Sequence, residues 1–213
     1  MLRDEQRAQG GALFYHVAAA YVAVKAGGAG RRSAGFSLIE LMVTIAVAAV
    51  LLAIAIPAFS NLMAQNELAV ASNAARGALL AARQTAVMRG HPVSLCAGNP
   101  EAGCTGDWSA GEWLVFRDTN HDGQLGADET VLHQGRVPGA GRTVSIDGNG
   151  PLRTALIYMP MGHAERVSGA FGAGRLRLCV ARDISPNARE LVVSASGRVR
   201  LQHVELDGAC PAL

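Results

Sequence analysis

Hydrophobic residues fill one long stretch near the N-terminus and give way to short alternating runs further along the chain. From Phe36 to Phe59 there are 24 residues, and the only charged one is Glu40. At about 1.5 Å per helical residue, this stretch is long enough to cross a bilayer core of roughly 30 Å. The pattern therefore predicts a transmembrane helix over residues 36–59.

The next thirty residues are rich in good helix formers. Residues 60–89 contain nine alanines and few residues that break a helix, so we expect the helix to continue to about Arg89. Pro57 removes one helical hydrogen bond, and it should kink or loosen the helix locally. The segment Gly90-His91-Pro92 predicts where the helix ends.

Beyond residue 90 the chain shows alternating polar and apolar positions, separated by Gly, Pro, Asn and Asp. This pattern is typical of antiparallel strands joined by turns. The predicted strands are Val93–Cys96, Glu112–Phe116, Thr130–Gln134, Thr143–Ile146, Ala155–Met159, Arg175–Val180, Leu191–Ala195 and Arg198–Gln202. We therefore predict an α+β fold, in which residues 90–213 form a β-rich domain that packs on the outer half of the long helix (residues 60–89).

Charge patterning predicts which way the helix crosses the membrane. Arg31 and Arg32 directly precede the apolar stretch, and positive residues keep that end of a span in the cytoplasm. The chain after Phe59 is then on the other side of the membrane. From Phe36 onward there are 14 arginines, no lysine and 15 acidic residues, so this part carries no global positive field that would indicate nucleic-acid binding.

The N-terminal motif resembles the processing site of type IV prepilins. Gly35 precedes Phe36, and Glu40 would be the fifth residue of the processed chain. The resemblance implies that residues 1–35 are a leader, although that is long for this class and a later start codon is an alternative. It also implies that a prepilin peptidase cuts after Gly35 and methylates the Phe36 amine, and that Glu40 pairs with the N-terminus of a neighbouring subunit. An ordinary signal anchor is the simpler alternative.

The β-rich part resembles the GspH/FimT group of minor pilins and pseudopilins. The resemblance rests on Leu95-Cys96, Cys104 with Trp108, the run 111–118, Leu178-Cys179 and Ser196 to Arg200. It implies a β-sandwich on a helical spine, anchored in the inner membrane with a periplasmic domain that becomes extracellular in a pilus. Its implied partners are other pilins, the prepilin peptidase and the inner-membrane assembly platform. The sequence leaves open whether the fibre is a type IV pilus or a type II secretion pseudopilus.

A basic motif near the C-terminus adds a second candidate function. Strand alternation places Arg198 and Arg200 on one face, about 6.6 Å apart, which approximates the phosphate spacing of a nucleic-acid strand. Arg175 and Arg177 lie on a neighbouring predicted strand. DNA-uptake members of the resembled family carry a Gly-Arg-x-Arg motif here, which implies double-stranded DNA as a partner in natural transformation. The alternatives are a solvated strand face and a purely structural priming or tip subunit of a pseudopilus.

Four cysteines follow the membrane helix: Cys96, Cys104, Cys179 and Cys210. An oxidising compartment favours disulfides, and four cysteines allow three pairings. We favour Cys96–Cys104, which closes a short loop, and Cys179–Cys210, which ties the C-terminal tail to a strand. A zinc site is the alternative, but the sequence has no compact Cys/His cluster.

An acidic loop carries the spacing of a calcium site. Asp118, Asn120, Asp122 and Glu129 occupy the ligand positions of an EF-hand loop. Strands rather than helices are predicted on both sides, so a polar hairpin loop built on Asx turns is the alternative. We expect no other cofactor. Five histidines are scattered through the chain after the helix and no nucleophile motif accompanies them, so we expect no enzymatic activity.

Overall fold

The computed structural model describes residues 37–213, so the predicted leader and the cleavage residues Gly35 and Phe36 lie outside the described residues. The described residues up to Val50 and those from Leu51 to Leu213 belong to two compact units. One helix, α2 (Leu38–Arg89), contributes residues to both units and is continuous through Pro57.

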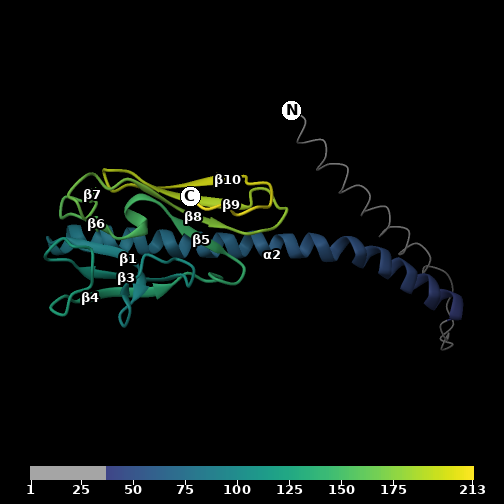
Figure 1. The fold of residues 1–213 in the computed structure, drawn as a ribbon. Coiled ribbons are helices and arrows are strands. Elements are labelled where there is room, and N and C mark those ends of the chain that lie inside the picture. The colour runs from purple at the N-terminus through teal and green to yellow at the C-terminus, as the bar shows by residue number, and fades with distance from the viewer. Residues whose placement is uncertain (1–36) are drawn as a thin grey trace. The chain divides into compact units, whose positions relative to one another are not determined.

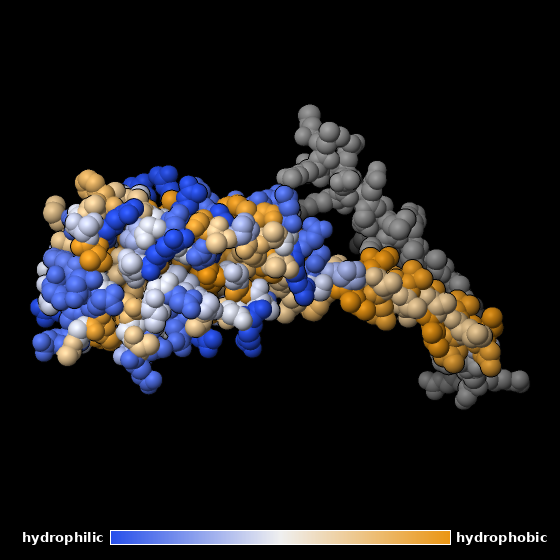
Figure 2. All heavy atoms as spheres, in the orientation of Figure 1, coloured by the Kyte–Doolittle hydropathy of each residue, from blue (hydrophilic) through white to orange (hydrophobic). Residues whose placement is uncertain are grey.

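The first part of α2 has no buried residue between Leu38 and Met63. Hydrophobic side chains cover it, shown in orange in Figure 2. Among residues 37–213, α2 is the one helix that is long and apolar enough to cross a membrane. An apolar surface of this kind is stable in lipid and costly in water.

The second part of α2 buries a narrow stripe of mostly small residues. Its buried positions recur every three or four residues, which places them on one helix face: Ala64, Leu68, Ala71, Ser72, Ala75, Ala78, Leu79, Ala82, Thr85 and Ala86. Because alanine has the smallest apolar side chain, this face lets the strands approach the helix closely. Leu68 and Leu79 are its only large members, and each is about 1% exposed.

The helix ends where the sequence predicts. The amide of Gly90 donates to the carbonyl oxygen of Ala86 at 3.0 Å, and Gly90 has a φ of +68°. Glycine adopts this left-handed conformation without the steric cost that a Cβ atom imposes. Pro92 follows and cannot continue the helix.

Two antiparallel sheets pack against the second part of α2 (Figure 1). The larger sheet has the order β4-β3-β1-β6-β7, with β2 paired to β1, and the smaller has the order β10-β9-β8-β5. The strands are β1 (Val93–Asn99), β2 (Gly103–Cys104), β3 (Glu112–Arg117), β4 (Val131–Arg136), β5 (Ser145–Gly148), β6 (Leu156–Tyr158), β7 (Ala164–Glu165), β8 (Gly174–Cys179), β9 (Ala188–Val193) and β10 (Val199–Val204). A short 3₁₀ helix, η1 (Gly150–Arg153), precedes β6.

One hydrophobic core joins the helix stripe to both sheets. It includes Leu95 of β1 with Leu176 of β8 and Leu191 of β9, together with the buried residues of α2. Leu95, Leu176 and Leu191 are each about 1% exposed or less. The predicted α+β class, a long helix with antiparallel sheets, is confirmed.

Two strands were missed by the sequence analysis. Both β2 and β7 contain two residues, which is too short for an alternating pattern. Strand β9 begins at Ala188, three residues before its predicted start. The missed part contains Glu190, which is buried although it is charged. A charged residue at a buried position breaks the apolar pattern by which the strand would be recognised.

Arg83 connects the helix to two loops of the β domain. Its Nε donates to the carbonyl oxygen of Gly162 at 2.8 Å, and its Nη2 donates to that of Ser196 at 3.2 Å. Nearby, burial raises the pKa of the Tyr158 hydroxyl, and the positive charge of Arg83 acts in the opposite direction. Arg83 thus links the C-terminal end of α2 to the turn that precedes β10.

Candidate functional site

Glu40 lies in the first turn of α2, and its side chain is exposed. The Ser37 side chain caps this turn, because its Oγ accepts a hydrogen bond from the Glu40 amide at 3.2 Å. The residues on both sides, Ile39 and Leu41, are exposed and apolar. No described residue forms an ion pair with the Glu40 carboxylate. In a membrane this arrangement places a carboxylate among apolar side chains, which favours a partner of opposite charge.

Arg200 lies at the start of β10, the edge strand of the smaller sheet, and Arg198 directly precedes this strand. Both side chains are exposed, whereas Val199 between them is buried. The two arginines therefore point to the outer face of the sheet, as strand alternation predicts. Neither has an ion-pair partner among the described residues, so both guanidinium groups are available to a ligand.

Arg175 and Arg177 share this outer face but differ in how far their guanidinium groups can contact a ligand. The carboxylate of Glu190, 4% exposed, accepts from Nε and Nη2 of Arg177 at 2.8 and 2.7 Å. Arg177 is 14% exposed, and its charge is neutralised within the protein. Arg175 lies 3.6 Å from the same carboxylate and is 55% exposed. Arg175 pairs with Val192 of β9, and Val192 pairs with Arg200 of β10, so Arg175 and Arg200 lie on the same face of the sheet. Because Arg177 is largely buried and neutralised, Arg175 is the one of the two β8 arginines that extends the exposed basic surface.

The C-terminal tail covers the part of the face around Arg177. The Nη1 atom of Arg177 donates to the carbonyl oxygen of Pro211 at 3.1 Å, and the Leu213 amide donates to Asp147 Oδ2 at 2.6 Å. A disulfide between Cys179 and Cys210 holds the tail to β8. This cover explains how Glu190 and Arg177 can be largely buried on an outward-facing side of the sheet.

The second disulfide joins Cys96 of β1 to Cys104 of β2, across a sequence separation of eight residues. The structure therefore has the pairing that the sequence analysis favours, and no free cysteine remains among the described residues. The bridges restrict two segments, residues 100–102 between β1 and β2 and the tail after β10, that supply no residue to the hydrophobic core clusters. The first closes the loop between β1 and β2, and the second holds the tail.

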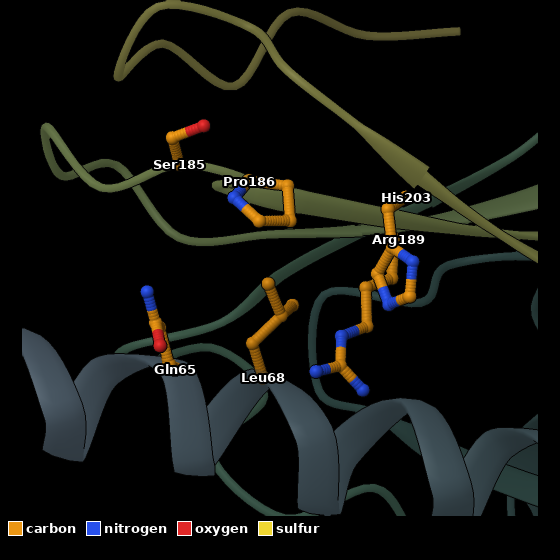
Figure 3. A pocket seen from close by; sticks show the side chains of 6 residues that line it. All are labelled: Gln65, Leu68, Ser185, Pro186, Arg189 and His203. Carbon is orange, nitrogen blue, oxygen red and sulfur yellow. The ribbon is translucent and has the colours of Figure 1, made fainter. Parts of the chain in front are cut away.

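Arg189 lies on the opposite side of β9 from this basic face. Its side chain points toward α2 and donates from Nη1 to Ser72 Oγ at 3.2 Å. Figure 3 shows Arg189 and His203 beside Gln65 and Leu68 of the helix and near Ser185 and Pro186. These six residues line an open pocket of about 290 Å³. The sequence analysis missed this pocket because its walls come from segments more than 100 residues apart.

The acidic loop lies between β3 and β4, and its carboxylates converge. One carboxylate oxygen from each of Asp118, Asp122 and Glu129 lies within 4.8 Å of the others. Asn120 belongs to the same loop, where its Nδ2 donates to Asp122 Oδ2 at 2.8 Å. The structure thus brings the predicted ligand residues together, on the larger sheet and away from the strands that carry Arg198 and Arg200.

Comparison with known proteins identifies two family models that match the chain. The model described as type II transport protein GspH matches residues 71–197. The model described as the prokaryotic N-terminal methylation motif matches residues 30–56, which include Gly35, Phe36 and Glu40. No curated protein matches the chain.

Two solved structures are similar in part. A crystal structure of the type IV minor pilin FimU from Pseudomonas aeruginosa is 18% identical, with a TM-score of 0.47, and the match covers 65% of this chain and 90% of FimU. The minor pseudopilin EpsH from the type 2 secretion system of Vibrio cholerae is 12% identical, with a TM-score of 0.44, covering 64% of this chain and 97% of EpsH.

Proposed function

Because this chain belongs to the GspH family of type II transport proteins, we propose that it is processed by a prepilin peptidase and enters a type IV pilus or a type II secretion pseudopilus through α2. Family membership and the methylation motif make it a minor pilin or pseudopilin. The observation that carries the proposal is the exposed apolar part of α2 with its single carboxylate, Glu40. Before assembly this apolar surface would contact lipid, and after assembly it would pack against the helices of neighbouring subunits. The role is structural and not catalytic.

We further propose how the chain is placed in the inner membrane. Arg31 and Arg32 precede the span, and positive residues favour the cytoplasmic side. The β domain then lies in the periplasm and becomes extracellular when the subunit enters a pilus. Two disulfides support this placement, because they persist in oxidising compartments. Residues 1–35 would be the leader, and the assembly platform of the inner membrane would be the partner that extracts the subunit.

Substitution of Gly35 by alanine should abolish processing. The expected result in cells that express a prepilin peptidase is an uncut precursor, whereas the wild-type chain loses 35 residues and gains a methyl group on the Phe36 amine. Intact mass spectrometry of both membrane-extracted proteins measures this difference. Substitution of Gly77, a helix glycine with open space around it, by alanine is the matched control and should be processed normally. A mature mass in the Gly35 variant would contradict the proposal.

A second candidate function is DNA capture by the exposed arginines of β10. The supporting observation is that Arg198 and Arg200 flank buried Val199 and have no acidic partner among residues 37–213. Arginine suits forked contacts with phosphate oxygens. Arg175 adds a third, partly paired charge on the same face, and Arg177 is excluded because Glu190 already neutralises it. Double-stranded DNA, taken up in natural transformation, is the proposed ligand.

The double variant Arg198→Ala/Arg200→Ala should weaken DNA binding about tenfold or more at low salt. The loss of two phosphate contacts should also reduce the slope of log K against log salt by about 2. Fluorescence anisotropy of a random-sequence duplex with the full chain in nonionic detergent, at several salt concentrations, measures both effects. Arg117→Ala/Arg142→Ala removes the same charge from exposed positions elsewhere and is the control. Equal losses in both double variants, or no binding by the wild type, would leave only the structural role.

A further inference from the structure

The loop that joins β3 to β4 is long and held firmly at its base. The Asp118 amide donates to the carbonyl oxygen of Pro92 at 3.2 Å, and the Arg117 amide donates to that of Thr130 at 3.0 Å. In its middle, Leu125 packs against a small core cluster that contains Phe116 and Leu114. The loop is therefore anchored at both ends and at one point between them, which positions its polar residues.

Three carboxylates converge inside this loop without a positive neighbour. Asp118, Asp122 and Glu129 each place one oxygen within 4.8 Å of the others. Among residues 37–213, no Arg, Lys or His forms an ion pair with any of them. Like charges at this separation repel one another, so the arrangement favours a cation between them.

Asp118 is the buried member of the cluster, and half of its carboxylate has no partner. The residue is about 0% exposed. Its Oδ2 accepts from Ser94 Oγ at 2.6 Å and from the Gly123 amide at 3.1 Å. Its Oδ1 is buried and has no hydrogen-bond partner among the described residues. An unsatisfied buried carboxylate oxygen is costly, and a bound cation would remove that cost.

The spacing of the polar residues and the backbone conformation at Gly123 match those of a twelve-residue calcium-binding loop. Asp118, Asn120, Asp122 and Glu129 occupy positions 1, 3, 5 and 12 of a twelve-residue loop. Position 6, where such loops require glycine for a sharp turn, is Gly123, with a φ of +68°. A Cβ atom there would lie 2.8 Å from the Cβ of Ala155, so the site also excludes a side chain sterically. We propose that the loop from Asp118 to Glu129 binds a calcium ion.

The donor set explains why calcium fits better than other common metals. All the candidate ligands are carboxylate, amide or backbone oxygens, which suit hard cations rather than zinc or copper. Calcium accepts six to eight oxygens in flexible arrangements, whereas magnesium requires a near-ideal octahedron and retains several waters. The usual EF-hand helices are absent on either side of the loop. The two strands β3 and β4 hold its ends instead.

Calcium should raise the melting temperature of the full chain in nonionic detergent. For an affinity of about 0.1–1 mM, as in extracellular calcium modules, 10 mM CaCl₂ after treatment with a chelator should raise Tm by about 3–10 °C. Scanning fluorimetry measures this shift, and isothermal titration calorimetry should give one site per chain. MgCl₂ at the same concentration should produce less than half the shift.

Variants separate a true site from general charge screening. Glu129→Gln and Asp122→Asn should each lose most of the calcium-dependent rise, while their Tm in chelator stays at or above that of the wild type, because each removes one repelling charge. Asp128→Asn removes the same charge from an exposed residue of the loop that is outside the cluster, and it should retain the full rise. The proposal is overturned if the wild type shows no shift, if both cluster variants keep it, or if magnesium equals calcium.

Discussion

Substitution of Glu40 by alanine is expected to lower incorporation into fibres between about tenfold and a hundredfold, while the chain is still cut and anchored in the membrane. A carboxylate inside a membrane helix costs up to about 3 kcal/mol, and each 1.4 kcal/mol changes an equilibrium constant tenfold. In a fibre, the positively charged N-terminal amine of a neighbouring subunit would relieve this cost. The alanine variant has no cost to relieve, so it loses that driving force for assembly.

The experiment compares the amounts of wild-type and Glu40→Ala subunit in sheared fibres, normalised to the processed subunit in the membrane. Glu67→Ala is the matched control, because Glu67 is the other acidic residue of α2 and lies outside the apolar stretch. It should be incorporated like the wild type. Normal incorporation of the Glu40 variant would contradict an assembly role, and a failure of processing would make Glu40 part of peptidase recognition instead.

Substitution of Leu79 by alanine is expected to destabilise the protein by about 3 kcal/mol. Leu79 is about 1% exposed and is one of two large side chains in the buried stripe of α2. The surrounding stripe consists mainly of alanines, whose short side chains cannot move to fill the cavity. For a chain of this size, the loss corresponds to a decrease in Tm of about 6–12 °C.

Thermal unfolding of the full chain in detergent, followed by tryptophan fluorescence, measures the effect, since Trp108 lies in the same core. Leu62→Ala is the same substitution at a position of the helix that is 52% exposed, and it should change Tm by less than about 2 °C. Equal decreases in both variants would show that the leucines stabilise the helix itself and not its packing against the sheets.

Local patterns along the chain were enough to predict most of the secondary structure. The helix ends at Arg89 because Gly90 and Pro92 act on the backbone directly. Strands β8 and β10 alternate clearly enough to be recognised near their observed bounds. Strands β1 and β3 are continuous buried apolar runs bounded by turn residues, and they were also recognised. Strands β2 and β7 were missed, because two residues cannot establish a period. The two disulfides match the favoured pairing, which joins each cysteine to the nearer partner along the chain.

The availability of the arginines depended on contacts that no local pattern reveals. Arg175 and Arg177 look equivalent in sequence, yet Glu190 and the tail residue Pro211 engage Arg177 and leave Arg175 half exposed. Arg189 lies between Arg177 and Arg198 in the sequence, but its position on β9 directs it toward Ser72 of the helix. Arg198, Arg200 and Arg175 keep the exposure that strand alternation suggests, but Arg175 also lies beside the Glu190 carboxylate.

The sequence by itself determined the membrane helix, its end, the antiparallel strands and the spacing of the acidic loop, because each depends on residues a few positions apart. The tertiary structure decided which charges are free. It neutralised Arg177 with Glu190, turned Arg189 toward the helix and buried Asp118 with one oxygen unpaired. The physical reason is that burial and pairing are set by neighbours in space, and these neighbours come from strands and tails far apart along the chain.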